Sequence, residues 1–181
     1  PHVNFWIMMT CSGLILTTYS TWANPAWMKD VRFDFSNIAI GVLLAVALWV
    51  VFWLGEFFST LLFDFARPQV DMIYGMKEGE NPWVLTALML FIIGPAEEIF
   101  WRGYLQKNFT ERWNPDVAFA VTTLMYSLVH ISKFNFMLIM AAAVAGFIWG
   151  LAYRFFPERL GAIIISHALW DCAVFIWFPI L

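Results

Sequence analysis

The sequence predicts an all-α integral membrane protein, built as a polytopic bundle of about six transmembrane helices. Apolar residues make up 62% of the 181 positions and charged residues only 13%, whereas a soluble domain has about 45–50% and about 25%. The 11 tryptophans and 19 phenylalanines suit a lipid-facing surface and its headgroup region. The net charge of −3 gives no basic footprint, so we expect no nucleic-acid partner.

Six apolar stretches are candidates to cross the bilayer, because a transmembrane helix needs about 20 apolar residues. In chain order they are Val3–Ala23, Phe35–Phe63, Trp83–Leu105, Val117–Ile131, Phe134–Phe156 and Leu160–Leu181. The first ends at Asn24-Pro25, the second is long enough to tilt, and the fourth is short. The third holds the densest cluster of polar residues.

The stretch from Asp64 to Asn81 carries charges throughout and is typical of an interfacial helix or loop. We therefore expect a single membrane domain over residues 1–181. Its first part, 1–82, would hold two peripheral helices and this interfacial segment, and 83–181 would form a four-helix core.

Lysines and arginines in short loops predict the orientation of the bundle. With six spans, one side would collect six basic residues and the other side three. The larger set is Lys29, Arg32, Lys107, Arg112, Arg154 and Arg159, and the smaller set is Arg67, Lys77 and Lys133. We expect an integral protein of the plasma membrane with the larger set in the cytoplasm.

Ionisable groups inside a span are costly and usually mark a functional site. Seven of them lie in or at the edge of the predicted spans. They are Glu56, Glu97, Glu98, Arg102, His130, His167 and Asp171. Each alone also fits a structural role, such as an ion pair at a helix end or a hydrogen-bonded core histidine.

The third stretch offers two carboxylates in different environments. Glu98 and Arg102 are four residues apart and share a helix face, so they can pair. Glu97 lies about 100° around the helix and is not neutralised by that pair. Adjacent carboxylates held in different surroundings are what acid–base chemistry needs. Pro95 removes a helical hydrogen bond just upstream and can widen the helix for water or a substrate backbone.

The histidines are predicted to meet these carboxylates. His130 follows Tyr126 by four residues, and His167 precedes Asp171 by four, so each pair shares a helix face. Counting the helical rise of 1.5 Å per residue from the ends of the spans, we expect these groups and Glu97 to converge in the cytoplasmic half of the membrane.

The order and spacing of these groups resemble a known family. Glu97-Glu98-Ile99-Phe100-Trp101-Arg102 is similar to EExxxR, Tyr126-Ser127-Leu128-Val129-His130 to FxxxH, and His167-Ala168-Leu169-Trp170-Asp171 to HxxxN. These are the motifs of the CAAX-protease and bacteriocin-processing intramembrane proteases. The resemblance covers about Trp83 to Leu181.

The resemblance implies a membrane endopeptidase with a conical cavity open to the cytoplasm and a hydrophobic or lipidated peptide as its substrate. Glu97 with His130 would activate the attacking water, and His167 and Asp171 would stabilise the oxyanion. Glu98 and Arg102 would support the site, together with Tyr126. Residues 83–181 would then be the catalytic core.

Two residues depart from the family pattern. Tyr126 stands where the pattern has phenylalanine, so its hydroxyl needs a hydrogen-bond partner if it is buried. Asp171 stands where asparagine is usual, and an ionised carboxylate repels an oxyanion that an amide would hold. Asp171 could help to stabilise the oxyanion if its carboxyl group is protonated, or by orienting His167.

Two alternatives stay open at this point. The expected enzyme needs no cofactor, but His130, His167, a glutamate and Asp171 could also bind zinc. A non-hydrolytic role of the same fold is the other alternative, either binding a partner as an immunity protein does or handling protons through the buried acids. Glu56 fits neither account, and we expect it to be a structural hydrogen-bonding group in the second span rather than a cavity wall.

Overall fold

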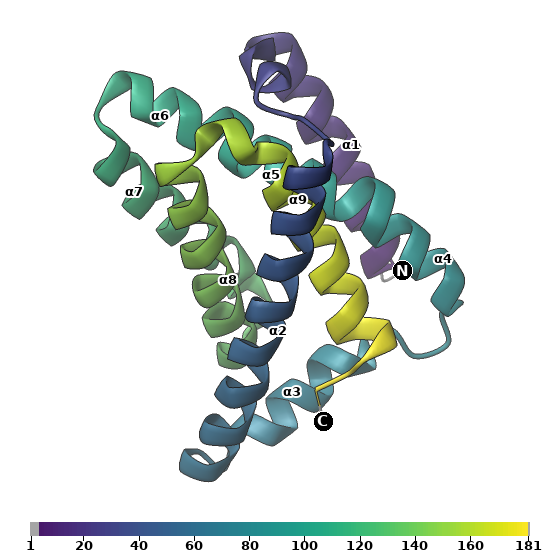
Figure 1. Ribbon diagram of the computed structural model, residues 1–181. Helices are drawn as coiled ribbons and strands as arrows, with labels where there is room; N and C mark the ends of the chain where they lie inside the picture. The colour runs from purple at the N-terminus through teal and green to yellow at the C-terminus, as the bar shows by residue number, and fades with distance from the viewer. Residues whose placement is uncertain (1–3, 181) are drawn as a thin grey trace.

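A computed structural model describes residues 4–180, and every regular element in this range is helical (Figure 1). Val3 and Leu181, the outer limits of the first and last predicted spans, lie outside the described residues. The separate helices are α1 (Phe5–Ala23), α2 (Phe35–Leu62), α3 (Ala66–Gly75), α7 (Pro115–Leu128), α8 (Phe136–Phe155) and α9 (Leu160–Cys172). The all-α class predicted from composition is confirmed for the described residues.

One long helix runs from Pro82 to Arg112 through the middle of the bundle. It contains α4 (Pro82–Leu88), α5 (Gly94–Glu98) and α6 (Lys107–Arg112), joined by π-helical turns at Met89–Ile93 and Ile99–Gln106. A third π-helical turn, Ala173–Trp177, extends α9. Short 3₁₀ turns lie at Pro25–Lys29, Val129–Lys133 and Pro157–Arg159.

Asparagine and aspartate side chains fix where most of the helices begin. Each accepts hydrogen bonds from backbone N–H groups of the first turn, which have no partner inside the helix. These residues are Asn4, Asp34, Asn81, Asn114 and Asn135. The polar breaks between the apolar stretches therefore mark real helix ends.

Four helices are long and apolar enough to cross a membrane: Phe35–Leu62, Pro82–Arg112, Phe136–Phe155 and Pro157–Trp177. The other two predicted spans are weaker. Helix α1 has 19 residues but is interrupted by serine, threonine and tyrosine. Helix α7 has 14 residues, or about 21 Å at 1.5 Å per residue, against a hydrocarbon core of about 30 Å. The predicted count of six spans therefore stays a prediction.

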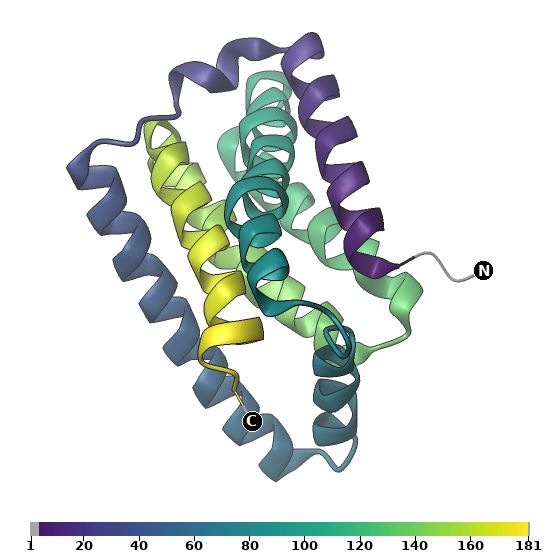
Figure 2. The ribbon, with the colours of Figure 1, turned by 90° about the vertical axis from the view of Figure 1, so that its right-hand side faces the viewer.

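The long central helix and α9 form the centre of the bundle (Figures 1 and 2). Helix α9 packs along α2 on one side and against α5 on another, while α7 pairs with α8 and α1 lies against the central helix. A core of Leu48, Trp149, Leu160 and Ile163 joins α2, α8 and α9. Many large apolar side chains on the outer faces remain exposed, as a lipid-facing surface requires.

The predicted interfacial segment contains α3, which lies across one end of the bundle (Figure 1). Gln69 ties α3 to the start of α8: its backbone carbonyl accepts from Asn135 Nδ2 at 2.8 Å, and its side-chain oxygen accepts from the Met137 N–H at 3.0 Å. Two segments that are far apart in the sequence are thus joined at this end of the molecule.

Candidate active site

The helix that carries the paired carboxylates is distorted beside them. Pro95 has no N–H to donate, and the Gly94 N–H bonds to the Met89 carbonyl five residues back, which is a π-type turn. A second π-helical segment begins at Ile99, directly after Glu98. Such wide turns are frequent at functional sites, and the distortion expected from Pro95 is present.

Glu98 and Arg102 form the ion pair that their spacing predicts. Arg102 Nη1 lies 2.7 Å from Glu98 Oε1, and both side chains are fully buried. Arg102 Nη2 donates to the Gly146 carbonyl on α8 at 3.1 Å. The guanidinium also lies over the Tyr126 ring, 4.8 Å from its centroid, a favourable cation–π contact. The pair therefore ties the central helix to α7 and α8.

The same glutamate holds a histidine from α9. His167 Nδ1 lies 2.6 Å from Glu98 Oε1, and the imidazole stacks on Trp149 with ring centroids 3.9 Å apart. Since a carboxylate oxygen accepts, Nδ1 donates its proton to Glu98. The other nitrogen, Nε2, then faces Asp171 Oδ2 at 3.5 Å and Glu97 Oε2 at 3.9 Å.

A glycine lets α5 and α9 approach closely enough for these contacts. A Cβ atom on Gly94 would lie 2.8 Å from Ala168 Cα, which is backbone and cannot turn aside. Ala168 directly follows His167, so the absence of a side chain at Gly94 sets the distance between the histidine and the two glutamates.

Glu97 lies outside the ion pair, as the helical geometry predicts. Its Oε2 accepts a hydrogen bond from the Tyr126 hydroxyl at 2.9 Å. Glu97 is thus the hydrogen-bond partner that the buried Tyr126 hydroxyl requires. A phenylalanine at position 126 has no hydroxyl and could not donate this hydrogen bond. The carboxylate is 17% exposed, which keeps it within reach of a ligand.

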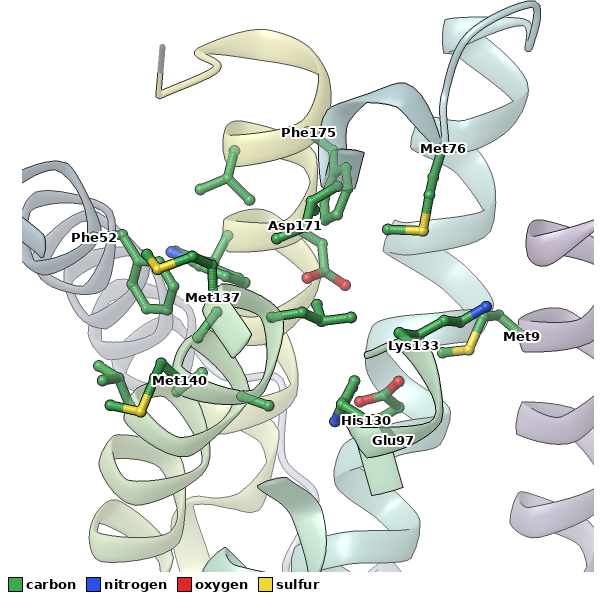
Figure 3. Close-up of a pocket in the computed structure, with 18 of the residues that line it drawn as sticks. Met9, Phe52, Met76, Glu97, His130, Lys133, Met137, Met140, Asp171 and Phe175 are labelled. Atoms are coloured by element: carbon green, nitrogen blue, oxygen red, sulfur yellow. The ribbon is translucent and has the colours of Figure 1, made fainter. Parts of the chain in front are cut away.

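His130 lies on the same cavity but outside this set of short contacts. It belongs to the 3₁₀ turn Val129–Lys133, and its Nδ1 lies 2.9 Å from the Tyr126 carbonyl. Because a carbonyl only accepts, Nδ1 carries the proton, and Nε2 of the neutral ring is an acceptor. Figure 3 shows the ring beside the Glu97 carboxylate.

These residues line a cavity of about 690 Å³. Its wall contains Glu97, Tyr126, His130, His167 and Asp171, and the Glu97 and Asp171 carboxylates point into it (Figure 3). Most of the remaining wall is apolar. Six of the nine methionines contribute to it: Met8, Met9, Met76, Met89, Met137 and Met140. Methionine is flexible and polarizable, so this wall can adapt to apolar ligands of different shape.

The structure shows contacts of Glu56, Lys77 and Trp149 that the sequence did not indicate. Glu56 on α2 pairs with Arg67 on α3 at 2.7 Å, and it also lines the cavity, so both roles considered for it are present. Burial lowers the pKa of Lys77, whose ammonium donates to the Phe175 carbonyl at 2.5 Å. Trp149, which stacks on His167, was also missed, because nothing in its spacing distinguishes it from ten other tryptophans.

The zinc alternative would need these side chains to be rearranged. Within residues 4–180, no three histidine, cysteine, aspartate or glutamate side chains are grouped so that they could hold a metal ion as they stand. The nearest approach to such a group is His167 with Glu97, Glu98 and Asp171, in which both imidazole nitrogens already face carboxylates.

Fold and site together define a helical membrane protein in which carboxylates and histidines from three helices line one apolar cavity. The chain belongs to the family described as Type II CAAX prenyl endopeptidase Rce1-like, whose model matches residues 79–173, more than half of the chain. This confirms the family resemblance, and the three motifs, from Glu97 to Asp171, lie inside the matched range, whereas Glu56 lies outside it. No curated protein and no solved structure matched the chain.

Proposed function

We propose that the protein is an intramembrane endopeptidase that hydrolyses a peptide bond in a hydrophobic or prenylated, CAAX-type peptide. A water molecule activated by Glu97 would attack the scissile carbonyl. The substrate would enter the apolar cavity from the lipid or from its open end. The enzyme would need no cofactor, and the membership of the chain in a family of CAAX prenyl endopeptidases supports this class of reaction.

The observation that carries the proposal is that two adjacent glutamates have different contacts. Glu98 is fully buried and committed to Arg102 and His167, whereas Glu97 accepts one hydrogen bond from Tyr126 and reaches the cavity. A carboxylate that is held by one hydrogen bond and faces a cavity is suited to accept a proton from water. A purely structural pair would leave neither carboxylate available.

The other groups take complementary roles in the proposed mechanism. His130 Nε2 would accept a hydrogen bond from the same water. His167 would donate to the developing oxyanion through Nε2, which requires the imidazolium form because its Nδ1 proton is held by Glu98. One such donor typically contributes about 10²–10³ in rate. Asp171 would orient His167, or donate as a protonated acid.

The non-hydrolytic alternative is less well supported. An immunity or binding role does not need a free carboxylate beside two histidines, and the family match favours a peptidase. The test is to incubate the purified protein in lipid with farnesylated and with plain hydrophobic peptides, against a Glu97→Gln variant. Glutamine still accepts the Tyr126 hydrogen bond but cannot take a proton.

We expect wild type to cleave at least one peptide and Glu97→Gln to lose about 10²–10⁴-fold in kcat, the usual contribution of a general base. Equal rates for the two proteins would contradict the assignment of Glu97. A metal chelator is expected to leave the wild-type rate unchanged, and loss of activity that zinc restores would favour the metal alternative instead.

The proposed reaction also places the cavity on the cytoplasmic side of the plasma membrane, where a CAAX-type peptide would be presented. The cavity is lined by residues of α3 and by Lys133. Helix α3 lies at one end of the bundle, and α6 and the connection between α1 and α2, which carry Lys29, Arg32, Lys107 and Arg112, lie at the other end (Figures 1 and 2). The cytoplasmic cavity and the orientation predicted from charge counting therefore cannot both hold.

A further inference from the structure

Lys133 is a cation on the cavity wall that the proposed mechanism does not use. It lies three residues after His130 on the 3₁₀ turn Val129–Lys133. In a 3₁₀ helix, residues three apart are eclipsed, so the two side chains leave the turn on the same face. Both line the cavity, and Figure 3 shows Lys133 beside His130 and Glu97.

The ammonium of Lys133 has no acidic partner in the described part of the chain. No carboxylate of residues 4–180 lies within 4.0 Å of it, and its contact is with the Phe5 ring, 5.0 Å from the centroid. The two other cations at this end are occupied: Arg67 pairs with Glu56 and Asp71, and Lys77 donates to a backbone carbonyl. Lys133 is therefore the cation best placed to receive an anion that enters the cavity.

A peptide in this cavity would meet the carboxylates of Glu97 and Asp171, which repel an anionic side chain, and that of Glu56, which is paired with Arg67. Among the described residues that line the cavity, Lys133 is the one lysine or arginine. An anion brought into an apolar cavity needs an opposite charge, because its desolvation is otherwise too costly. The anion that every unmodified peptide carries is its C-terminal carboxylate. The charges of the cavity thus favour a peptide that enters with its C-terminus towards Lys133.

We propose that Lys133 binds the C-terminal carboxylate of the substrate and so sets the distance from the chain end at which the peptide is cut. This inference rests on the proposed peptidase function. The rise along the 3₁₀ turn from His130 to Lys133 is about 6 Å, at roughly 2 Å per residue. The lysine side chain extends this distance further. The total from His130 to the Lys133 ammonium is then comparable to the roughly 10 Å that three extended residues span. A short C-terminal fragment would be the product.

The experiment compares a peptide that ends in a free carboxylate with the same peptide as its C-terminal amide. The base sequence is an S-farnesylated cysteine followed by three apolar residues, in vesicles that contain the purified protein. Wild type is expected to show a KM at least about tenfold lower for the acid than for the amide, the effect of one hydrogen bond to a charged group. Its kcat should differ less than threefold between the two.

Three variants complete the design. Lys133→Gln is expected to raise the KM for the acid to the value for the amide, while Lys133→Arg retains the preference. Lys77→Gln is the matched control, because it removes a charge at the same end that is already bound to the Phe175 carbonyl. It should keep the full preference for the acid. The melting temperature of each variant checks that the fold is intact.

The outcomes separate this inference from the function on which it rests. If wild type cleaves acid and amide with equal KM, or Lys133→Gln keeps the preference, then Lys133 is not the carboxylate site and the peptidase assignment stands. If wild type and Glu97→Gln both fail to cleave either peptide, the proposed function fails and this inference fails with it. Lengthening the peptide by two residues at its C-terminus should move the cut by two residues, whereas an unmoved cut would contradict the distance rule.

Discussion

Glu98 is the residue on which the geometry of the site depends. One of its oxygens accepts from both Arg102 and His167, so a single buried carboxylate fixes an arginine on its own helix and a histidine on α9. Removing one partner of such a buried pair leaves a charge without compensation, which costs more than the pair itself contributes.

The change Arg102→Met is therefore expected to lower the free energy of unfolding by about 3–5 kcal/mol. Adding Glu98→Gln in the same chain should restore part of that loss, because the uncompensated charge is then gone. Thermal unfolding in detergent measures both. Arg112→Met, an exposed position in the same long helix, is the control and should change stability by less than about 0.5 kcal/mol. A similar loss in both variants would show that the buried pair has no special role.

Asp171 is the residue where this chain departs most from the pattern of its family. Its carboxylate lies 3.5 Å from His167 Nε2, the nitrogen that would donate to the oxyanion in the proposed mechanism. The change Asp171→Asn keeps the size of the side chain but removes the negative charge beside the His167 imidazolium. We expect kcat to fall severalfold, measured with the farnesylated peptide, because His167 loses the group that orients it, and KM to stay within a factor of two or so. A rise of kcat would show instead that the carboxylate repels the oxyanion and that the amide donates to it.

The residue-level expectations succeeded where they depended on one helix. The Glu98–Arg102 pair and the separation of Glu97 from it follow from helical spacing alone. The stacking of His167 on Trp149 and the bond from Tyr126 to Glu97 depend on how α7, α8 and α9 pack. Spacing along the sequence carries no information about those contacts.

At the scale of the helices, the close approach of α5 and α9 depends on Gly94. In Gly94→Ala the new Cβ would lie 2.8 Å from Ala168 Cα, so α9 must move away and carry His167 with it. We expect a loss of at least about 10²-fold in kcat, because misplacement of catalytic groups by about 1 Å costs that much. The melting temperature should also fall.

Gly75→Ala, at the end of α3, is the matched control, because nothing lies within 4 Å of its Cβ position. It should leave kcat and the melting temperature nearly unchanged. If Gly94→Ala behaved like this control, the two helices would have enough freedom to absorb a methyl group, and the site would not depend on their close packing.

The helix ends were largely predictable, and the irregular parts were not. The charged stretch was predicted to end at Asn81, which caps α4, and the spans predicted to begin at Val117 and Phe134 lie within two residues of the starts of α7 and α8 at Pro115 and Phe136. The fourth predicted span, 117–131, is instead a helix that ends at Leu128 and continues as the 3₁₀ turn that carries His130. Such a change of helical type leaves no signal in apolar periodicity, because Val129 and Ile131 continue the apolar stretch past the end of α7.

At the scale of the whole molecule, the position of the cavity and the count of basic residues predict opposite orientations in the membrane. Counting basic residues places the end with Lys29, Arg112 and Arg159 in the cytoplasm. The cavity is lined by Lys133 and by residues of α3, the helix at the other end (Figure 1). Three of the six basic side chains at the first end are held by neighbouring groups: Lys107 by Asp30, Arg154 by Asp116 and Arg159 by the Ser36 hydroxyl. A peptidase that takes its substrate from the cytoplasm needs the cavity end on that side.

Cysteine labelling decides the orientation. Cys11 and Cys172 are first replaced by alanine, and single cysteines are then introduced as Glu78→Cys in the exposed loop after α3 or as Arg112→Cys at the opposite end. With a membrane-impermeant maleimide and inverted vesicles, which expose the cytoplasmic side, we expect Glu78→Cys to react and Arg112→Cys to be protected. Both variants should cleave peptide normally, since neither position lines the cavity. The reverse labelling pattern would mean that the charge rule holds and that the substrate reaches the cavity from the lipid or from the far side of the membrane.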